Sequence, residues 1–292
     1  MTQQLIPTIH VVEESLPAAW ERSITETWKH GMRIPTQFDH PEDPNSRDVS
    51  ALIVVKDPFA EPRFHRCFPG GFYDLEKYVA EVLDGVDDTA RAEIGCYTYH
   101  ERLNFYRTGV ASGIYYGQRM VKQLSAVLDN LMECQFTRRA QATTWVPDED
   151  CDSTEPPCLQ RLWFRVIEDE KQNPQLCMSV DFRSNDGFKA AYMNMYALTW
   201  LQARMAVLLS DRMGYEVGVG QYTHYANSYH LYGSYFSEIE SFLLDVDGRR
   251  TWEDRTMTTA EAWKYGWKED QDAVKAKYGL PGLWPFKGLD TW

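Results

Sequence analysis

Residues 155–167 read Glu-Pro-Pro-Cys-Leu-Gln-Arg-Leu-Trp-Phe-Arg-Val-Ile, and the interpretation of the chain starts from this stretch. The two prolines fix the direction of the backbone, and the apolar-rich run Leu159–Ile167 that follows them predicts a β-strand. Cys158 therefore stands at the start of a strand, where a thiol can face a cavity, and we take it as the candidate nucleophile. The alternative is a buried structural cysteine, which is the commoner role of a cysteine outside disulfides.

Outward from this strand, the spacing of apolar residues predicts a mixture of strands and helices with no repeating strand–helix–strand order. The next strand, Leu176–Phe182, follows after a charged turn that contains Asn173-Pro174. We expect further strands at 50–55 and 229–235, and helices near 16–28, 72–83, 121–131 and 195–208. This order predicts an α+β fold in which residues 1–292 form a single domain, with a mixed sheet flanked by helices.

The composition argues against several classes of function. The chain has 30 basic and 43 acidic residues and a formal net charge of −13, which disfavours general nucleic-acid binding. Its six cysteines form no Cys-x-x-Cys pair, so a structural zinc site is not expected. The sequence has no run of 18 apolar residues and no signal-like opening segment. We therefore expect a cytoplasmic protein with reduced thiols, no membrane partner and no metal.

Two groups of arginines offer a place for an anion. Arg138 and Arg139 are adjacent and precede a β-like run, and Arg183 is followed directly by Ser184. A guanidinium fork beside a hydroxyl suits a phosphate group. Adjacent side chains on a strand point to opposite faces, so Arg138 and Arg139 reach one phosphate only at a strand end or across a subunit boundary. The alternative for all three arginines is a solvated surface.

Asn194, His230 and Tyr232 are candidates for reading a nucleotide. Asn194 stands at the start of an otherwise apolar helix, where a buried amide can act as donor and acceptor toward the edge of a uracil. A helix cap is the alternative for this residue. His230 and Tyr232 alternate on a predicted strand and so face the same side, where they could hold a sugar hydroxyl. The alternative for this pair is an aromatic-rich sheet.

The spacing of these motifs resembles the thymidylate synthase and deoxycytidylate hydroxymethylase superfamily. The resemblance is clearest between Tyr116-Gly117 and Tyr232, and the first third of the chain matches only loosely. It rests on the Arg-Arg pair, Trp145 standing 13 residues before Cys158, Arg-Ser-x-Asp with Asn194 eight residues after Asp186, Glu-Val-Gly at 216–218, and His-Leu-Tyr at 230–232.

The resemblance implies a thymidylate synthase-like fold and a homodimer through the sheet, in which each active site borrows Arg138 and Arg139 from its partner. It implies a pyrimidine nucleoside monophosphate as substrate and 5,10-methylenetetrahydrofolate as co-substrate. The implied site has Cys158, Glu81, Tyr116 and Asn194 as catalytic residues, Arg47, Arg138, Arg139, Arg183, Ser184, Asn194, His230 and Tyr232 for the nucleotide, and Asp186 for the folate.

The implied mechanism begins when the Cys158 thiolate adds to C6 of the uracil in dUMP, while Asn194 and Glu81 stabilise the charge that reaches O4. Carbon C5 then takes up the one-carbon unit. Three departures from the synthase pattern favour water over hydride as the last reactant. They are Asn185 within Arg-Ser-x-Asp, the lack of a tryptophan in 97–102, and a tail that ends in Trp292. We therefore expect a dUMP 5-hydroxymethylase. Residues 279–292 are a candidate C-terminal lid, and the alternative for this segment is packing on the surface.

Other functions remain open at this point. Within the superfamily they are a thymidylate synthase, which would methylate dUMP to dTMP, and a CMP or dCMP hydroxymethylase. Outside it they are a non-catalytic nucleotide-binding protein and a papain-like hydrolase that uses Cys158 with His224 or His230. The hydrolase would need neither the arginines nor a folate. Among these alternatives, only a transferase is expected to form a covalent adduct with dUMP.

Overall fold

The computed structural model describes residues 5–112 and 115–265, with the side chains of 109–118 and 265 left out of the description. Its contacts divide the described residues into two compact units. The first unit contains the chain up to Leu75, Asp181–Tyr196 and the chain from Gln221 onward. The second unit contains Glu76–Val180 and Ala197–Gly220. The long helix α7 (Ala191–Met213) and the strand β11 (Gly218–Leu231) each contribute residues to both units.

The first unit is built on a mixed sheet. Strand β1 (Thr8–Glu13) runs parallel to β3 (Ser46–Val55), whereas β2 (Met32–Ile34) and β11 run antiparallel to β3. The short strand β10 (Asn185–Asp186) pairs in parallel with β11. These pairings bring the ends of segments that are far apart in the sequence, near 47, 186 and 230, onto neighbouring strands.

A β-bulge between Ala226 and Tyr229 changes the direction of the side chains of β11. Before the bulge the buried residues are Tyr222, His224 and Ala226, and after it Tyr229 and Leu231 continue the buried side. One extra residue in a strand shifts the alternation of its side chains in this way. As a result Ser228 and His230 lie on the opposite face from Tyr229, and His230 is opposite Asp48 on β3 and Asp186 on β10.

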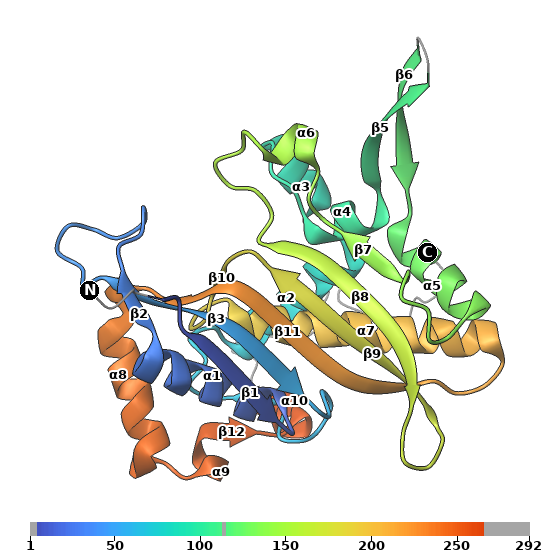
Figure 1. Cartoon of the computed structure of the whole chain (residues 1–292). Coiled ribbons are helices and arrows are strands. Elements are labelled where there is room, and N and C mark those ends of the chain that lie inside the picture. The colour runs from blue at the N-terminus through green and yellow to red at the C-terminus, as the bar shows by residue number, and fades with distance from the viewer. Residues whose placement is uncertain (1–4, 113–114, 266–292) are drawn as a thin grey trace. The chain divides into compact units, whose positions relative to one another are not determined.

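Helix α1 (Leu16–His30) covers β1 and β3 in the first unit (Figure 1). Ser15 precedes it in an extended conformation, Pro17 stands in its first turn, and its apolar residues recur at helical spacing. Trp20 is fully buried at the centre of an aromatic cluster and donates its indole N–H to the carbonyl of Gly187 at 2.8 Å. The cluster consists of Trp20, His65, Phe68, Phe188, Tyr192 and Phe242.

The remaining elements of the first unit are short, and some of them add buried residues to the same core. The strand β4 (Phe64–His65) pairs antiparallel with β12 (Thr256–Met257). Helix α8 (Phe236–Leu244) buries Phe236, Ile239 and Phe242. They are accompanied by the helical turns at Gly233–Tyr235 and Asp245–Arg249 and by the helices α9 (Trp252–Arg255) and α10 (Thr259–Tyr265).

The second unit contains the strands in the order β9 (Pro174–Phe182), β8 (Leu159–Glu168) and β7 (Gln141–Thr143). Helix α5 (Gln123–Glu133) packs on β7 and β8. Strands β5 (Tyr106–Ser112) and β6 (Tyr115–Val121) form a long antiparallel hairpin (Figure 1). The other helices are α2 (Phe72–Asp84), whose first turn belongs to the first unit, α3 (Asp88–Glu93), α4 (Tyr99–Asn104) and α6 (Pro147–Asp150).

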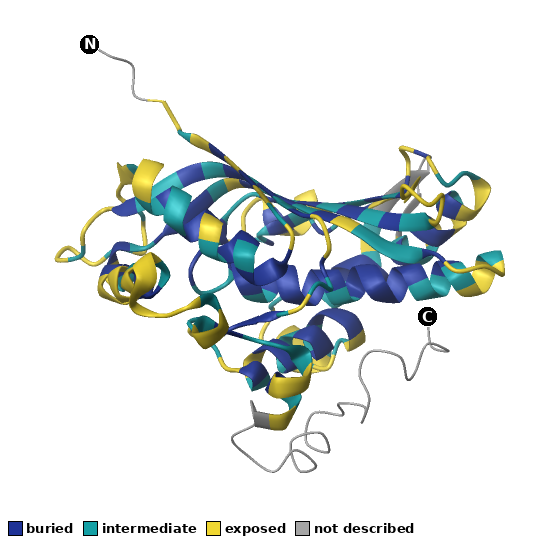
Figure 2. Cartoon of the chain, turned by 90° about the horizontal axis from the view of Figure 1, so that it is seen from below, coloured by how far each residue is buried: buried dark blue, intermediate teal, exposed yellow. Residues whose placement is uncertain are grey.

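Helix α7 is buried along most of its length, as the dark blue of the long helix in Figure 2 shows. Its polar side chains in the second unit therefore need internal partners. Gln202 donates hydrogen bonds from Nε2 to the carbonyls of Leu176 and Gly220 at 2.8 and 2.9 Å. Arg204 donates from Nη1 to the carbonyl of Leu83 at 3.0 Å and pairs with Asp84 at 2.8 Å. These contacts tie α7 to α2, β9 and β11.

The α+β class and the mixed sheet flanked by helices are confirmed. Of the predicted elements, the helix near 121–131 begins only at Gln123, because Val121 closes the β5–β6 hairpin. The strand predicted at 229–235 ends at Leu231 and extends back to Gly218. The single-domain boundary 1–292 and the homodimer stay predictions, and the lid at 279–292 lies outside the described residues. None of the helices in the described part of the chain combines the length and the apolar composition needed to cross a bilayer.

Candidate active site

Cys158 stands immediately before β8, as predicted, and its half-buried thiol has a fixed backbone on both sides. The backbone N–H of Leu159 donates to the hydroxyl of Tyr99 at 3.2 Å, and the Leu159 carbonyl accepts from the hydroxyl of Thr144. On the other side, Gln160 donates from Nε2 to the carbonyl of Pro157 at 2.6 Å. The position of the sulfur is therefore set by hydrogen bonds as well as by the prolines.

Two tyrosines of the second unit, Tyr78 and Tyr99, lie near this thiol, and a third, Tyr97, lies beside Tyr99. Burial raises the pKa of Tyr78 and of Tyr99 well above the usual value, and the negative charges that Cys158 and Tyr97 can carry act in the same direction. The rings of Tyr97 and Tyr99 lie 5.9 Å apart. Both Tyr78 and Tyr99 stay neutral at physiological pH, so each keeps a hydroxyl proton that it can donate.

The sequence analysis did not assign a role to these tyrosines. It noted Tyr97–Arg102 only for the lack of a tryptophan, and it chose Tyr116 as the active-site tyrosine. Tyr116 lies on β6 opposite Ala111, and its side chain is outside the description, so its role stays a prediction. The contact between Tyr99 and Leu159 joins residues 60 positions apart. The only local signal was the Tyr-Thr-Tyr sequence, in which Thr98 caps α4.

Glu81 lies on α2 in the same unit and shares its surroundings with two charged residues. The ammonium group of Lys77, one helical turn earlier, lies 3.0 Å from the Glu81 carboxylate and 3.5 Å from that of Asp87. Burial raises the pKa of Glu81, Asp87 adds to this effect, and Lys77 opposes it. Glu81 is thus a carboxyl group whose affinity for a proton is increased, which a general acid near neutral pH requires.

Arg138 and Arg139 lie between α5 and β7 with exposed side chains. Arg139 pairs with Glu133 at 2.9 Å, with both side chains about two-thirds exposed. An ion pair this exposed contributes little to stability. The carbonyl of Arg138 accepts a hydrogen bond from the indole of Trp163 at 3.1 Å, which fixes the backbone rather than the guanidinium group. Both arginines therefore present their charge at the surface, and their place in a partner's site stays a prediction.

Arg183 and Ser184 connect β9 to β10 in the first unit and are half-buried. The next residue, Asn185, is only 3% exposed, and its amide oxygen accepts a hydrogen bond from Nε2 of His224 at 3.0 Å. Nδ1 of His224 lies 3.0 Å from the hydroxyl of Tyr222, and the ring stacks on Phe182 at 4.7 Å. Burial lowers the pKa of His224 to about 3, so this histidine is a neutral core residue.

Asp186 begins the turn that leads to α7. Its carboxylate accepts hydrogen bonds from the backbone N–H groups of Phe188 and Lys189, both at 3.0 Å. Burial raises the pKa of Asp186, and these two hydrogen bonds oppose that effect. One of its oxygens is therefore engaged by the fold, and the predicted contact with a folate stays a prediction.

Asn194 is 6% exposed and lies inside α7. The helix begins at Ala191, and the Asn194 N–H already donates to the carbonyl of Ala190 at 2.9 Å. The alternative role of helix cap is therefore excluded, because a cap precedes the first helical residue. What remains is a buried amide on the first turns of a helix, and its role in reading a base stays a prediction.

Arg47 and His230 lie on the neighbouring strands β3 and β11 of the first unit. The prediction that Tyr232 alternates with His230 on one strand is wrong, because β11 ends at Leu231 and Tyr232 begins the next turn. Arg47 stands on β3 opposite Leu231, and its guanidinium group lies 4.6 Å from the centre of the Trp28 ring. Burial and the nearby Arg33 lower its pKa. The rings of His230 and Tyr232 meet edge to face at 4.6 Å. Burial lowers the pKa of His230 to about 4, against the effects of the Ser228 backbone and Asp39.

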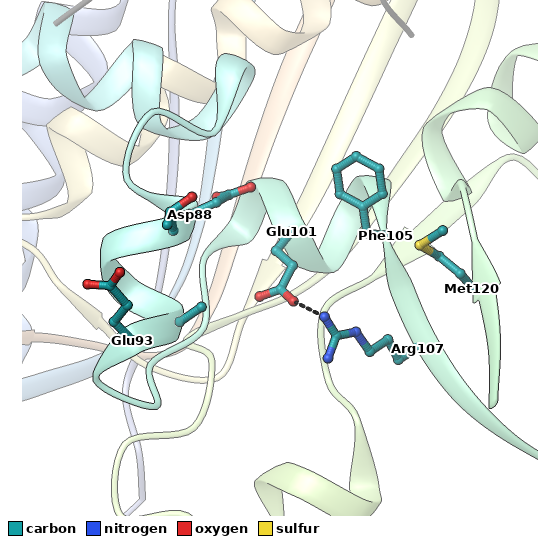
Figure 3. A pocket seen from close by; sticks show the side chains of 8 residues that line it. Asp88, Glu93, Glu101, Phe105, Arg107 and Met120 are labelled. Carbon is teal, nitrogen blue, oxygen red and sulfur yellow. Dashed lines mark ion pairs between the residues drawn. The ribbon is translucent and has the colours of Figure 1, made fainter.

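A hollow of about 560 Å³ lies elsewhere in the second unit, between α3, α4 and the β5–β6 hairpin (Figure 3). Three of the charged side chains that line it, Asp88, Glu101 and Arg107, have partners. Glu101 points toward Arg107 at 3.3 Å, and Asp88 bonds to Nδ1 of His100 at 2.6 Å. We assign no role to this hollow. In the described ranges, no group of three or more His, Cys, Asp or Glu side chains is arranged to hold a metal ion.

A comparison with known protein families matches the part of the chain that contains Cys158. The family model described as thymidylate synthase matches residues 89–251, which is more than half of the chain. The chain belongs to the thymidylate synthase family. The matched segment includes the candidate nucleophile, the Arg-Ser-x-Asp segment and the His-Leu-Tyr segment, so the resemblance seen in the sequence is confirmed.

Several archaeal relatives carry the name "Putative thymidylate synthase". The protein of Methanocaldococcus jannaschii is 27% identical over 227 residues, which cover 76% of this chain and 90% of that protein. The protein of Methanococcoides burtonii is 26% identical over 230 residues, covering 78% and 91%. The protein of Methanosarcina mazei is 27% identical over 235 residues, covering 80% and 94%. The likeness to these relatives thus extends well beyond the matched family segment.

Proposed function

We propose that this chain transfers a one-carbon unit from 5,10-methylenetetrahydrofolate to C5 of dUMP, and that the product is 5-hydroxymethyl-dUMP. The observation that carries this proposal is the setting of Cys158. Its thiol is held at a strand start beside tyrosines that stay neutral, in the same unit as a glutamate with a raised pKa. Membership of the thymidylate synthase family supports the reaction class.

In this proposal Cys158 forms a bond to C6 of the uracil, and the electron pair of the C5–C6 double bond moves toward O4. Asn194 donates a hydrogen bond to O4, and Glu81 supplies a proton there through water. Arg183, Ser184 and Arg47 bind the phosphate, and His230 and Tyr232 bind the sugar. C5 then bonds to the methylene carbon that the folate supplies, with Asp186 as the contact of the folate. Loss of the C5 proton and departure of tetrahydrofolate leave an exocyclic methylene group on C5. Water adds to this group, and release of the Cys158 sulfur restores the C5–C6 double bond and completes the turnover.

The polar hydroxyls around Cys158 favour hydration of the methylene group that forms on C5. Tyr78 and Tyr99 remain neutral and are therefore able to orient a water molecule beside the thiol. A hydride acceptor instead needs an environment from which water is excluded. Asn185, which we expected to add polarity, has its amide oxygen bonded to His224. The argument for hydration therefore depends on the tyrosines.

Thymidylate synthase activity is the second candidate. It is favoured by the three relatives described above, each of which carries the name "Putative thymidylate synthase". It would use the same residues up to the methylene intermediate and differ only in the last step. A CMP or dCMP substrate is a weaker candidate, because an asparagine at 194 matches the donor and acceptor pattern of uracil. His224 cannot serve as the base of a papain-like hydrolase, because both of its ring nitrogens are hydrogen-bonded in the core.

We also propose that the enzyme acts as a homodimer that lends Arg138 and Arg139 across the interface. The exposure of both side chains supports this arrangement. Mixing an inactive Cys158→Ser chain with an inactive Arg139→Ala chain should restore part of the activity, because one of the two mixed sites then carries neither change. No recovery after verified subunit exchange would contradict the shared site.

The test of the function is covalent trapping. The protein is incubated with 5-fluoro-dUMP and methylenetetrahydrofolate, and the mass of the denatured chain is measured. We expect an adduct on Cys158 in the natural chain and none in Cys158→Ser. A non-catalytic nucleotide-binding protein would bind the nucleotide without an adduct, and a hydrolase would do neither.

A further inference from the structure

Both ring nitrogens of His224 have hydrogen-bond partners, whereas only one ring nitrogen of His230 has a partner among the described residues. Nδ1 of His230 lies 3.2 Å from the hydroxyl oxygen of Ser228. Nε2 is buried and has no hydrogen-bond partner among the residues that the structure describes, and the residue as a whole is 5% exposed. A buried polar atom without a partner is costly, by about 1–3 kcal/mol, so such an atom indicates a place for a ligand.

The bulge in β11 and the strand register explain how Ser228 comes to contact both His230 and Asp48. His230 lies directly opposite Asp48 on β3, so their side chains share one face of the sheet. Ser228 precedes His230 by two residues and lies in the bulge between Ala226 and Tyr229. Its hydroxyl donates to Oδ2 of Asp48. The three side chains thus form one chain of contacts, Asp48–Ser228–His230.

The direction of the first hydrogen bond determines the second. A carboxylate can only accept, so the proton of the Ser228 hydroxyl is committed to Asp48. The Ser228 oxygen is then an acceptor toward His230, and Nδ1 must carry the ring proton. In neutral imidazole the other nitrogen has a lone pair and no proton. Nε2 is therefore an acceptor, and burial keeps the ring neutral because it lowers the pKa of His230 to about 4.

We propose that Asp48 and Ser228 are positioning residues that fix His230 as the Nδ1–H tautomer, so that Nε2 accepts a hydrogen bond from a sugar hydroxyl of the nucleotide. The inference rests on the proposed function, since it takes dUMP as the ligand. In dUMP the 5′ position carries the phosphate and the 2′ position has no hydroxyl. The donor is therefore the 3′-hydroxyl, and the site selects nucleotides in which this group is present and unmodified.

The segment 35–45, between β2 and β3, borders this imidazole. The Phe38 ring lies 6.2 Å from that of Tyr232, and Asp39 accepts the hydroxyl of Ser46 at 2.9 Å and acts on His230 through its charge. Because Nε2 is buried, a hydroxyl reaches it only if the groups that cover it give way. The ring of Tyr232 meets that of His230 edge to face at 4.6 Å, so Tyr232 lies beside the same imidazole.

The experiment compares dUMP with 3′-deoxy-3′-fluoro-dUMP, which has a similar size at that position but cannot donate a hydrogen bond. Dissociation constants are measured by calorimetry for the full chain. We expect the natural chain to bind the fluoro compound roughly tenfold to a hundredfold more weakly, from the cost of a buried acceptor left unpaired. In Ser228→Ala the ring can change tautomer, so this ratio should fall severalfold. Ser228→Thr, which keeps the hydroxyl, should restore it.

The matched control is Ser50→Ala. Ser50 also lies on β3 and also bonds to the bulge, through the carbonyl of Asn227 at 3.0 Å, but it does not contact His230. It should leave the ratio unchanged, which separates a loss of the bulge from a change of tautomer. Nitrogen-15 NMR of the histidine rings gives a second readout. We expect a protonated Nδ1 and an unprotonated Nε2 for His230, identified by its loss in His230→Gln.

A natural chain that binds both nucleotides equally, or that shows a protonated Nε2, would overturn this inference. So would an unchanged ratio in Ser228→Ala. Failure of the proposed function has a different signature, because dUMP would then not bind, or 5-fluoro-dUMP would form no adduct with Cys158. If the chain forms the adduct but binds both nucleotides equally, the proposed function stands and the inference about the His230 tautomer is wrong.

Discussion

The two units of the molecule differ in the kind of polar group that each holds. The second unit surrounds Cys158 with groups that can give or take a proton, namely neutral tyrosines and a glutamate poised between Lys77 and Asp87. The first unit holds groups whose protons are fixed, as in the Asp48–Ser228–His230 chain and in the Tyr222–His224–Asn185 chain. Under the proposed function, the nucleophile and Glu81 belong to the second unit, whereas Asn194 and the groups proposed for the sugar belong to the first.

The largest effect expected from this division is on the nucleophile. Cys158→Ser should lower turnover by roughly three orders of magnitude or more, because a neutral hydroxyl is a far weaker nucleophile than a thiolate. The affinity for dUMP should change little, because serine has nearly the size of cysteine and the proposed groups for the phosphate, sugar and base are unchanged. Turnover and calorimetric binding, measured on the same preparation, check both parts. A Ser variant that keeps substantial activity would contradict the assignment.

The next effect is on stability and concerns His224, the buried histidine of the recognition unit. His224→Ala removes the partners of Asn185 and Tyr222 and leaves a cavity, so it should cost about 2–4 kcal/mol of unfolding free energy. His230→Ala, whose Nε2 has no partner in the described structure, should cost less. Urea denaturation of both variants measures the difference. Equal losses would mean that the two histidines play the same structural role.

The same histidine predicts a pH dependence of stability. The pKa of His224 is about 3 in the folded chain, below the usual value of roughly 6.5. As the pH falls through that window, the unfolded chain takes up a proton that the folded chain does not, so His224 makes stability decrease toward acid. Replacing it by phenylalanine should flatten the decrease between about pH 6.5 and 4. A slope that does not change would show that His224 does not set it.

A somewhat smaller effect should appear in base selection. Asn194→Asp should shift the preference from dUMP toward dCMP by roughly a hundredfold, because a carboxyl group can match N3 and the N4 amino group of cytosine. The ratio of kcat/KM for the two nucleotides measures this change, with Gln202→Glu on the same helix as a control for a new buried acid. A natural chain that already prefers dCMP would contradict the assignment of Asn194 to uracil recognition.

The smallest expected effect is on the pH dependence of activity, and it tests Glu81 as the proton donor. Lys77→Met removes the charge that opposes the raised pKa of Glu81, so that pKa should rise further. If Glu81 acts as a general acid, activity is lost as the pH rises through its pKa, and the alkaline limb of the pH–rate profile should move to higher pH. Asp87→Asn should move it to lower pH. Shifts in the same direction in both variants would exclude Glu81 as the group observed.

The sequence predicted the fold where one pattern covered a whole element. The spacing from Met195 to Leu208 indicated α7, and the run after Cys158 indicated β8. Strand β11 was recognised only in part, because the bulge at 226–229 shifts the alternation of buried residues in its middle. The pattern therefore read as a short strand at 229–235, although the strand begins at Gly218.

Motifs in the sequence indicated candidate residues, whereas contacts that arise only through the fold left no such signal. Cys158, Asp186 and His230 stand in recognisable sequence contexts. Tyr99 could not be chosen, because its contact with Leu159 depends on the packing of α4 against the start of β8. Likewise the sequence did not show that the ring of His224 is held by Tyr222 and Asn185 in the core. His224 and His230 differ because the bulge between them turns one toward the core and the other toward Asp48 and Ser228.

The central claim is that this chain adds a hydroxymethyl group to C5 of dUMP. Mass analysis of the nucleotide formed from dUMP and methylenetetrahydrofolate tests it most directly, with Cys158→Ser as the blank. The account predicts a product heavier than dUMP by one carbon, two hydrogens and one oxygen, with tetrahydrofolate released. A product heavier by one carbon and two hydrogens only, formed together with dihydrofolate, would identify a thymidylate synthase and contradict the assignment of water as the last reactant.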